Sequence, residues 1–203
     1  FIKDQQFQSI ILKFELYCDK RSKADSGLSM IFLVGASFGA LVMTLGDRIG
    51  RKKTYNLGLV LIIIGFLSGI IYDTYWSIIL GYGLAMAGGD IVFSLAFIYL
   101  NESLGTRLRI MSNALMFSAF SLGEIVFNGG KFFVFNDYQG LLAFNLVCGI
   151  LTFIPAFFNL ESPMFLNLTE KNRKALFSWL VCVSRRNGLS RKEFDVALQD
   201  MYD

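Results

Sequence analysis

The stretch Gly46-Asp47-Arg48-Ile49-Gly50-Arg51-Lys52-Lys53 lies at the junction of two long apolar runs, residues 27–46 and 54–72. A helix of about 20 apolar residues is long enough to cross the ~30 Å hydrocarbon core of a bilayer. The stretch carries four cations and one acid, and short connectors rich in Lys and Arg stay on the cytoplasmic side of a membrane. We therefore expect a tight cytoplasmic turn between two transmembrane helices. Gly50 would supply the backbone freedom that such a turn needs.

The rest of the chain holds three more apolar runs of this kind, at 77–100, 110–130 and 139–160. Of all 203 residues, 54% are hydrophobic and 17% are charged, and the mean hydropathy is +0.52. A soluble domain carries about a quarter charged residues, so this composition excludes a soluble basic domain, and it also excludes a disordered chain. The sequence predicts an all-α protein, a polytopic bundle with five transmembrane helices.

The charges of the connectors predict how the bundle is oriented. The connector after the third run carries two arginines, and a cluster of cations follows the fifth run. The connectors on the opposite side are nearly neutral, with Asp73 in one and Lys131 and Asp137 in the other. Because positive charge stays inside, we expect the N-terminal segment outside and the C-terminus on the cytoplasmic side.

Three regions are expected along the chain. Residues 1–26 are polar and mixed in charge, which is typical of the remnant of an extracytoplasmic loop, and residues 27–160 form the transmembrane bundle. Residues 161–203 are expected to form cytoplasmic amphipathic helices, the second of which begins at the capping box of Ser190 and Glu193. The cations of this tail suit anionic lipid headgroups better than nucleic acid.

Two pairs of glycines have the spacing of helix contacts in lipid. The pairs are Gly35 with Gly39 and Gly65 with Gly69. Small residues four apart let two helix backbones approach closely, but so short a pattern also arises by chance. From the sequence, each pair is either a contact or a coincidence.

The stretch 46–53 resembles the loop signature of the major facilitator superfamily, the D-R-x-G-R-[KR] turn between its second and third helices. Glu102 followed by Arg109 resembles the E-x-x-P-x-x-x-R element after the fourth helix of that family, and Glu161-Ser162-Pro163 resembles the P-E-S-P-R element after the sixth. The resemblance implies a transporter with a conformational latch at one face. Its residues here would be Asp47, Arg48, Gly50, Arg51, Glu102, Arg109 and Glu161.

The segment Leu16-Tyr17-Cys18-Asp19-Lys20 resembles the L-V-C-D-K stretch before the second helix of the organic cation and anion transporters. On that register the five runs are helices two to six, a partial N-terminal half, without the first helix and the C-terminal half. The fourth helix of many relatives starts with a membrane-embedded Arg that residues 80–83 lack. The chain also departs from the family pattern at Met43, Gly105, Leu160 and Met164.

Two acids lie inside the expected spans, where a charge is costly and marks a functional candidate. Asp90 has Phe93 on its helix face, and Glu124 shares a face with Phe120 and Asn128. An acid beside aromatic rings suits an organic cation, because the carboxylate pairs with the positive charge and the ring quadrupole attracts the same charge. Since Phe supplies 21 of the 203 residues, chance explains such neighbours as well. Asp90 would then bond a polar side chain of a neighbouring helix.

The sequence favours secondary-active or facilitative transport of a small, organic ion-like solute by alternating access. The alternative is a transport-inactive, truncated relative that serves as a structural subunit of a larger membrane complex. The sequence has no Gly-Lys-Ser/Thr phosphate loop and no His, so neither an enzyme nor a cofactor or metal is expected. Expected partners are membrane lipids, the solute, and the missing helices or other subunits, with no nucleic acid. The plasma membrane is favoured, and an organelle membrane such as the mitochondrial inner membrane is the alternative.

Overall fold

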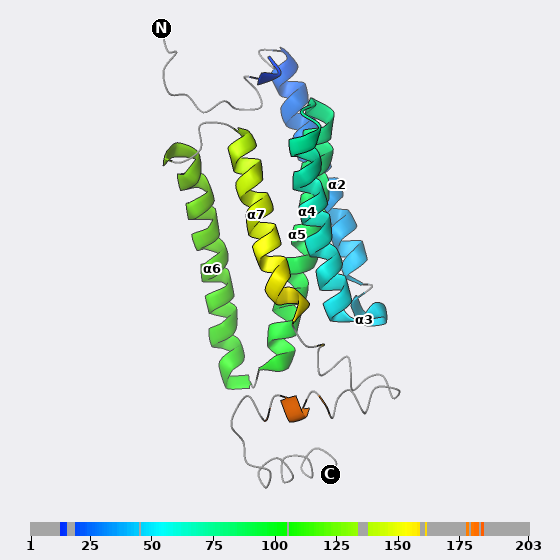
Figure 1. The fold of residues 1–203 in the computed structure, drawn as a ribbon, viewed down its shortest axis with the longest axis vertical. Helices are drawn as coiled ribbons and strands as arrows, with labels where there is room; N and C mark the ends of the chain where they lie inside the picture. Colours follow the sequence, from blue (N-terminus) through cyan, green and yellow to red (C-terminus); the bar gives the residue numbers. More distant parts are fainter. Residues whose placement is uncertain are drawn as a thin grey trace. The chain divides into compact units, whose positions relative to one another are not determined.

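The computed structural model describes residues 13–15, 19–44, 46–104, 106–133, 138–158, 161, 178, 180–182 and 184. These residues contain no strand and the helices α2 (Asp19–Met43), α3 (Gly46–Ile49), α4 (Arg51–Ile71), α5 (Tyr75–Ser103), α6 (Thr106–Phe133) and α7 (Tyr138–Phe157) (Figure 1). The chain divides into two compact units, Phe1–Asn159 and Leu160–Asp203, and all of these helices belong to the first. The expected all-α fold is confirmed.

The long helices of the first unit run alternately in opposite directions, so their connections gather at two ends (Figure 1). We call the end with Gly50 and with Leu104, where α5 ends, the basic end. We call the opposite end, with the turn 72–74 and the start of α7, the Asp73 end. Helix α2 begins at Asp19, before the apolar run that starts at residue 27. The amphipathic helices expected in 161–203 lie almost entirely outside the described residues.

Among the described residues, four helices contain a stretch that is long and apolar enough to cross a membrane. These stretches are Asp25–Met43 in α2, Arg51–Ile71 in α4, Tyr75–Glu102 in α5 and Tyr138–Phe157 in α7. The remaining expected run, 110–130, forms part of the continuous helix α6. Asn113, Glu124 and several serines lower the hydropathy of α6, so its crossing of the membrane stays a prediction.

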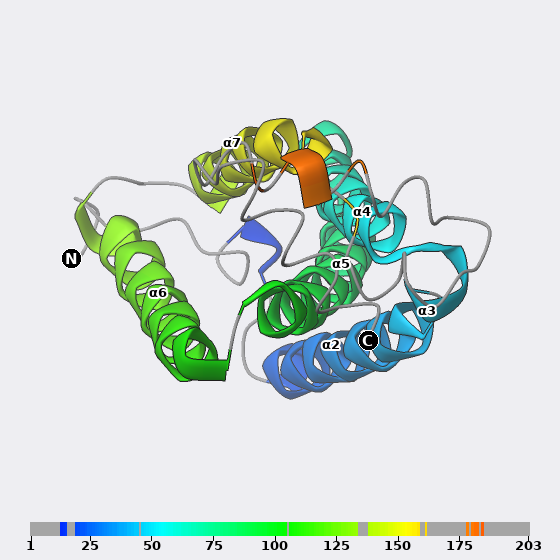
Figure 2. The same ribbon diagram turned by 90° about the horizontal axis from the view of Figure 1, so that it is seen from below.

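Helix α5 is the centre of the bundle, with α2 and α4 packed against it (Figure 2). A Cβ atom at Gly35 would lie 2.4 Å from the carbonyl oxygen of Gly83, and one at Gly39 would lie 2.6 Å from the carbonyl oxygen of Ala87. Backbone therefore meets backbone between α2 and α5, and this spacing leaves no room for a side chain. The glycine pair of α2 is a true helix contact.

The second glycine pair makes two different contacts. A Cβ at Gly65 would lie 2.5 Å from the carbonyl oxygen of Gly81 on α5, which is another backbone approach. At Gly69 the nearest atom would be the Leu142 Cδ1 of α7, 3.5 Å away, which is ordinary van der Waals distance. Of this pair only Gly65 is needed for close packing on α5.

Few large side chains are fully buried in the core of the bundle, and many large apolar side chains lie on its outer surface. Its fully buried large side chains lie on α4, α5 and α7, and they are Leu59, Ile78, Ile79, Ile91 and Leu142. Large apolar side chains such as Met30 and Ile110 are exposed, as expected where lipid replaces water as the surrounding solvent. Helix α7 packs on α4, and α6 packs on α5 and stands apart from α2 and α4 (Figure 2).

Candidate functional site

The turn between α2 and α4 is built on Gly50. Its φ of 117° and ψ of 140° lie in a region that residues with a side chain avoid. The Gly50 N–H donates to the Gly46 carbonyl oxygen at 3.2 Å, and the Thr54 N–H donates to the Gly50 carbonyl oxygen at 3.1 Å. The Thr54 hydroxyl donates to the same oxygen at 3.0 Å. The prediction that this turn needs Gly50 is confirmed.

Arg51, the first residue of α4, forms an ion pair with Glu102 near the end of α5. The two side chains are only 10% and 13% exposed. A buried charge left without its opposite costs several kcal/mol, so the two residues must be retained together. The pair holds the start of α4 against the end of α5. Two members of the predicted latch are therefore in direct contact at the basic end.

The other predicted latch residues lie elsewhere or outside the described part of the structure. Arg48 is exposed on α3, and the side chain of Asp47 beside it is not among those described. Arg109 donates its Nε–H to the carbonyl oxygen of Leu104 at 2.9 Å, which ties the start of α6 to the end of α5. Glu161 belongs to the second unit. Their joint role in a latch stays a prediction.

Four phenylalanines join α5 to α6. Phe93 lies 5.5 Å from Phe120 and 6.1 Å from Phe117 between ring centroids, and Phe97 lies 6.0 Å from Phe117. We call Phe93, Phe97, Phe117 and Phe120 the phenylalanine cluster. Its tilted and edge-on rings have the geometry that aromatic side chains prefer. The two rings on α6 are about half exposed, so the cluster has an open face.

The two candidate acids belong to different helix contacts. Asp90 lies beside α2, because a Cβ at Gly39 would be 3.1 Å from the Asp90 Cβ. Glu124 is exposed on α6, one turn beyond Phe120 of the phenylalanine cluster. Asn128 follows one turn later on the same helix, and its side chain is outside the described set. The structure therefore brings Phe93 and Phe120 together, with Glu124 one turn beyond Phe120 on α6, while Asp90 faces α2.

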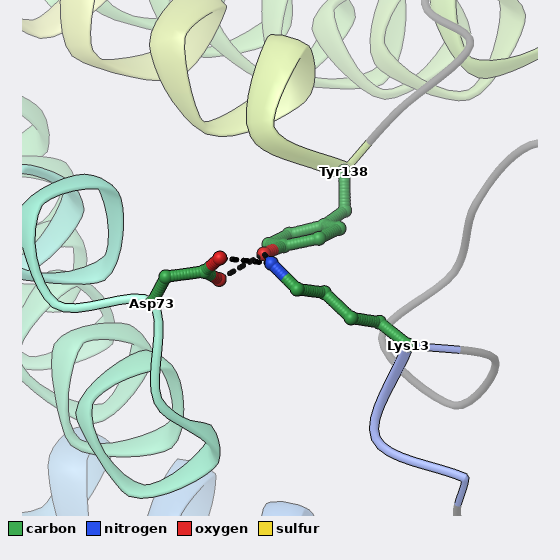
Figure 3. A network of polar contacts seen from close by, with 3 residues as sticks. All are labelled: Lys13, Asp73 and Tyr138. Carbon is green, nitrogen blue, oxygen red and sulfur yellow. Dashed lines mark hydrogen bonds and ion pairs between the residues drawn. The ribbon is translucent and has the colours of Figure 1, made fainter.

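Sequence reasoning missed two polar contacts between distant parts of the chain. The Asn113 side-chain amide donates to the Asn101 amide oxygen at 3.1 Å and links α6 to α5. At the Asp73 end, Lys13, Asp73 and Tyr138 meet (Figure 3). Asp73 is an isolated acid in a short, otherwise neutral connector, and this isolation was the available signal. The partners come from distant parts of the chain, so only the fold could identify them.

Comparison with known proteins shows the family. The profile of the family described as "Sugar (and other) transporter" matches residues 5–187. The chain is similar to an organic cation transporter protein of Drosophila melanogaster, with 25% identity over 68% of this chain and 25% of the relative. It is also similar to the organic cation/carnitine transporter 5 of Arabidopsis thaliana, with 26% identity over 83% of this chain and 33% of the relative.

The chain spans between a quarter and a third of the length of these relatives. The matched region contains the turn on Gly50, the Arg51–Glu102 pair and the phenylalanine cluster. Of these, Gly50, Arg51 and Glu102 belong to the motifs that carry the resemblance to the major facilitator superfamily. The chain belongs to the sugar (and other) transporter family of the major facilitator superfamily, and the two relatives it resembles are both named as organic cation transporters.

Proposed function

We propose that this chain is part of a carrier that moves a small organic cation across a membrane by alternating access. The two relatives are named for organic cations, and one also for carnitine. The single observation that carries the proposal is the Arg51–Glu102 pair beside the glycine turn. It places a buried charge contact at the end of the bundle that the family signature marks.

In this proposal the pair makes α4 and α5 move as one body. Alternating access rocks one half of a carrier against the other around a fixed site, so each half has to stay rigid. Breaking the pair would leave a charge buried without its partner, which is costly. Asp47 lies on α3, one short turn before Arg51 along the chain, and in our proposal it contacts the other half of the carrier while that face is shut.

The phenylalanine cluster and Glu124 are our proposed solute contacts. The carboxylate lies one helical turn from an exposed aromatic ring. It offers a negative charge to an organic cation, and the ring offers the attraction of its quadrupole. Such a site is mostly apolar with few polar groups, as this part of α6 is. Asp90 is the weaker candidate, because it lies in the contact between α5 and α2.

We further propose that the basic end faces the cytoplasm and the Asp73 end faces outside, in the plasma membrane. The exposed cations Arg48 and Lys53 lie at the basic end, and Lys52 lies with its ammonium 5.9 Å from the ring centroid of Phe157. Cations at that end suit the positive-inside rule and anionic lipid headgroups.

Uptake of radiolabelled tetraethylammonium by cells that express the native full-length protein tests the proposal. Asp47→Asn should slow uptake about fivefold or more, the size of an ordinary conformational coupling, without loss of protein from the membrane. Glu124→Gln should weaken apparent affinity for the cation. The matched control is Asp25→Asn, which removes an exposed carboxylate on α2 and should leave uptake unchanged.

Two results would contradict the proposal. Unchanged uptake in Asp47→Asn would contradict the role of Asp47 in the latch. Recovery of the wild-type protein only in a complex of constant stoichiometry, with no uptake, would favour a structural subunit.

A further inference from the structure

Three segments of the first unit converge at the Asp73 end through polar side chains (Figure 3). The Lys13 ammonium donates to the carboxylate of Asp73 in the α4–α5 turn, and to the hydroxyl of Tyr138, the first residue of α7, at 2.6 Å. The Tyr138 hydroxyl in turn donates to the other oxygen of Asp73. One ammonium ion thus has two oxygen acceptors, one charged and one neutral.

Aromatic rings lie on the other sides of the same ammonium. The Lys13 Nζ is 5.0 Å from the ring centroid of Tyr138 and 5.8 Å from that of Phe14. Both distances are within the ~6 Å range over which a ring quadrupole attracts a cation. Carboxylate, hydroxyl and rings together are the groups that recognise a protonated amine.

The walls of this arrangement are fixed by packing. Tyr138 is 4% exposed and packs with Ile78 and Leu142, and Phe14 packs against the same cluster. The Phe14 ring also contacts Tyr75 edge-on, at 5.9 Å between centroids. The side chains of Lys13 and Asp73 remain 31% and 39% exposed. The charge pair of Lys13 and Asp73 therefore lies beside packed aromatic side chains and remains accessible to solvent and solutes.

The backbone next to Lys13 is strained. Glu15 has a φ of 49°, which places a residue with a side chain in the left-handed region at a cost of about 1 kcal/mol or more. The contacts of Phe14 and Lys13 are the described interactions that hold this turn in place. Release of Lys13 would therefore also release local strain.

We propose that Asp73, Tyr138 and Phe14 form a cradle for a protonated amine at the Asp73 end, and that the Lys13 ammonium is its tethered occupant. An alkylammonium ion enters the cradle when Lys13 swings out, and it donates its N–H groups to the same two oxygens. The end of a lysine side chain is chemically an alkylammonium ion, so the chain itself shows which ligand chemistry fits. A quaternary ammonium has no N–H to donate and fits less well.

The charges of the cradle persist at neutral pH. The hydrogen bonds from Lys13 and Tyr138 lower the pKa of the Asp73 carboxyl, and the hydrogen bonds to Asp73 and Tyr138 raise the pKa of Lys13. The Asp73 carboxylate therefore stays charged and available to a cation, and Lys13 stays charged and competes with a free amine for it. Because Lys13 is tethered, its effective concentration is high, and a free amine has to displace it.

Such a cradle would capture amines before they reach the deeper solute contacts. The inference rests on the proposed function only in identifying the captured amine with the transported solute. Binding by the cradle is independent of transport, and it is measured separately.

Calorimetric titration of the native full-length protein with n-butylammonium tests the cradle. Lys13→Met removes the tethered ammonium and should tighten butylammonium binding about tenfold or more, by the loss of an intramolecular competitor. Lys13→Arg keeps a tethered cation and should bind as weakly as the wild type. Adding Asp73→Asn to Lys13→Met should abolish the gain. The increase in affinity caused by Lys13→Met should be smaller for tetramethylammonium than for butylammonium.

Lys53→Met is the matched charge control, because it removes an exposed lysine at the opposite end of α4. It should leave butylammonium binding unchanged. Equal binding by wild type and a folded Lys13→Met variant, or a gain that persists with Asp73→Asn, would overturn the cradle. If the binding results are as predicted but the wild-type protein takes up no cation, the transport proposal is refuted and the cradle is not.

Discussion

Arg51 and Glu102 show how a single charged pair positions two helices of the bundle. Each side chain is nearly buried at the basic end, where neither charge is tolerated without the other. Arginine suits this place better than lysine, because its planar fork of donors matches a carboxylate and is weakly hydrated. The pair is thus a specific contact between the first residue of α4 and the end of α5.

We expect Glu102→Gln to destabilise the protein by about 3–5 kcal/mol, the usual cost of removing one partner of a buried pair. The double variant Arg51→Met/Glu102→Leu should recover most of that loss, because both charges are gone. Thermal unfolding of the detergent-solubilised full-length protein measures both. Arg109→Met is the control, because Arg109 is exposed and donates its Nε–H to a backbone carbonyl oxygen; it should cost less than ~1 kcal/mol. Full stability of Glu102→Gln would mean that the pair contributes little.

The contact between Lys13 and Asp73 has its own pH dependence. Its stabilisation is complete between the ordinary pKa values of Asp and Lys, about 3.9 and 10.4. It is lost as the pH falls through the lowered pKa of Asp73 and as the pH rises through the raised pKa of Lys13. The Tyr138 hydroxyl also donates to Asp73, and it carries no charge over most of this range.

We therefore expect the difference in melting temperature between wild type and Asp73→Asn to stay constant from about pH 5 to pH 9. It should shrink at lower pH, and high salt should reduce it at every pH, because the pair is partly exposed. Melting curves in a pH series give this difference directly. A difference that grows toward low pH would show that the pair does not stabilise the fold.

Among the helices, α5 depends most on small residues. Its backbone approaches α2 at Gly83 and Ala87 and approaches α4 at Gly81 and Gly88. In a membrane no hydrophobic force drives one apolar helix onto another, so close van der Waals packing carries the association. The central position of α5 therefore follows from small residues on two of its faces.

The neighbours Gly88 and Gly89 allow a matched test on this one helix. A Cβ at Gly88 would lie 2.4 Å from the Gly58 carbonyl oxygen, whereas a Cβ at Gly89 would meet nothing within 4 Å. We expect Gly88→Ala to cost about 1–3 kcal/mol, because α4 has to move away. Gly89→Ala should be neutral or stabilising by up to ~1 kcal/mol, since Ala favours a helix. Thermal unfolding separates the two, and equal melting temperatures would contradict this packing.

At the scale of the whole molecule, the first unit is an open bundle. Helix α6 keeps large apolar side chains such as Met111 and Leu115 exposed, and its described contacts lie on α5 through the phenylalanine cluster and the Asn113–Asn101 bond. These side chains need lipid or further helices around them, because water would make their exposure costly. The apolar faces of the bundle thus suit an apolar surrounding such as lipid.

Cysteine labelling tests the orientation of the bundle. Helix α4 has 21 residues, which corresponds to about 30 Å, the thickness of the hydrocarbon core. In a cysteine-free full-length background, Lys53→Cys at the basic end should react with a membrane-impermeant maleimide only from the cytoplasm. Tyr72→Cys, at the other end of α4, should react only from outside. Reversed labelling would refute the orientation predicted by the positive-inside rule.

Local patterns in the chain predicted the helices well, because the length of an apolar run is set by the bilayer. Each of the five expected runs overlaps one long helix, namely α2, α4, α5, α6 or α7, although the bounds differ by several residues. The requirement for Gly50 was also predictable, since a sharp turn between two helices demands a special backbone conformation. The family followed from the spacing of the turn and its charges, and the comparisons confirm it.

The neighbours of each side chain were not predictable in the same way. Whether Gly65 or Gly69 meets a backbone depends on which face of α4 turns toward α5, and helix periodicity leaves that open. Asp90 and Phe93 share a face by periodicity, yet they lie against α2 and α6 respectively.

The chain alone therefore established the long apolar helices, the basic turn and the family, because each depends on residues close together in sequence. The Arg51–Glu102 pair, the phenylalanine cluster and the contact of Lys13 with Asp73 and Tyr138 appear only in the folded bundle. Each of them joins residues from different helices or connections. Such contacts depend on the rotation and register of neighbouring helices, which are set by the packing of all their faces at once.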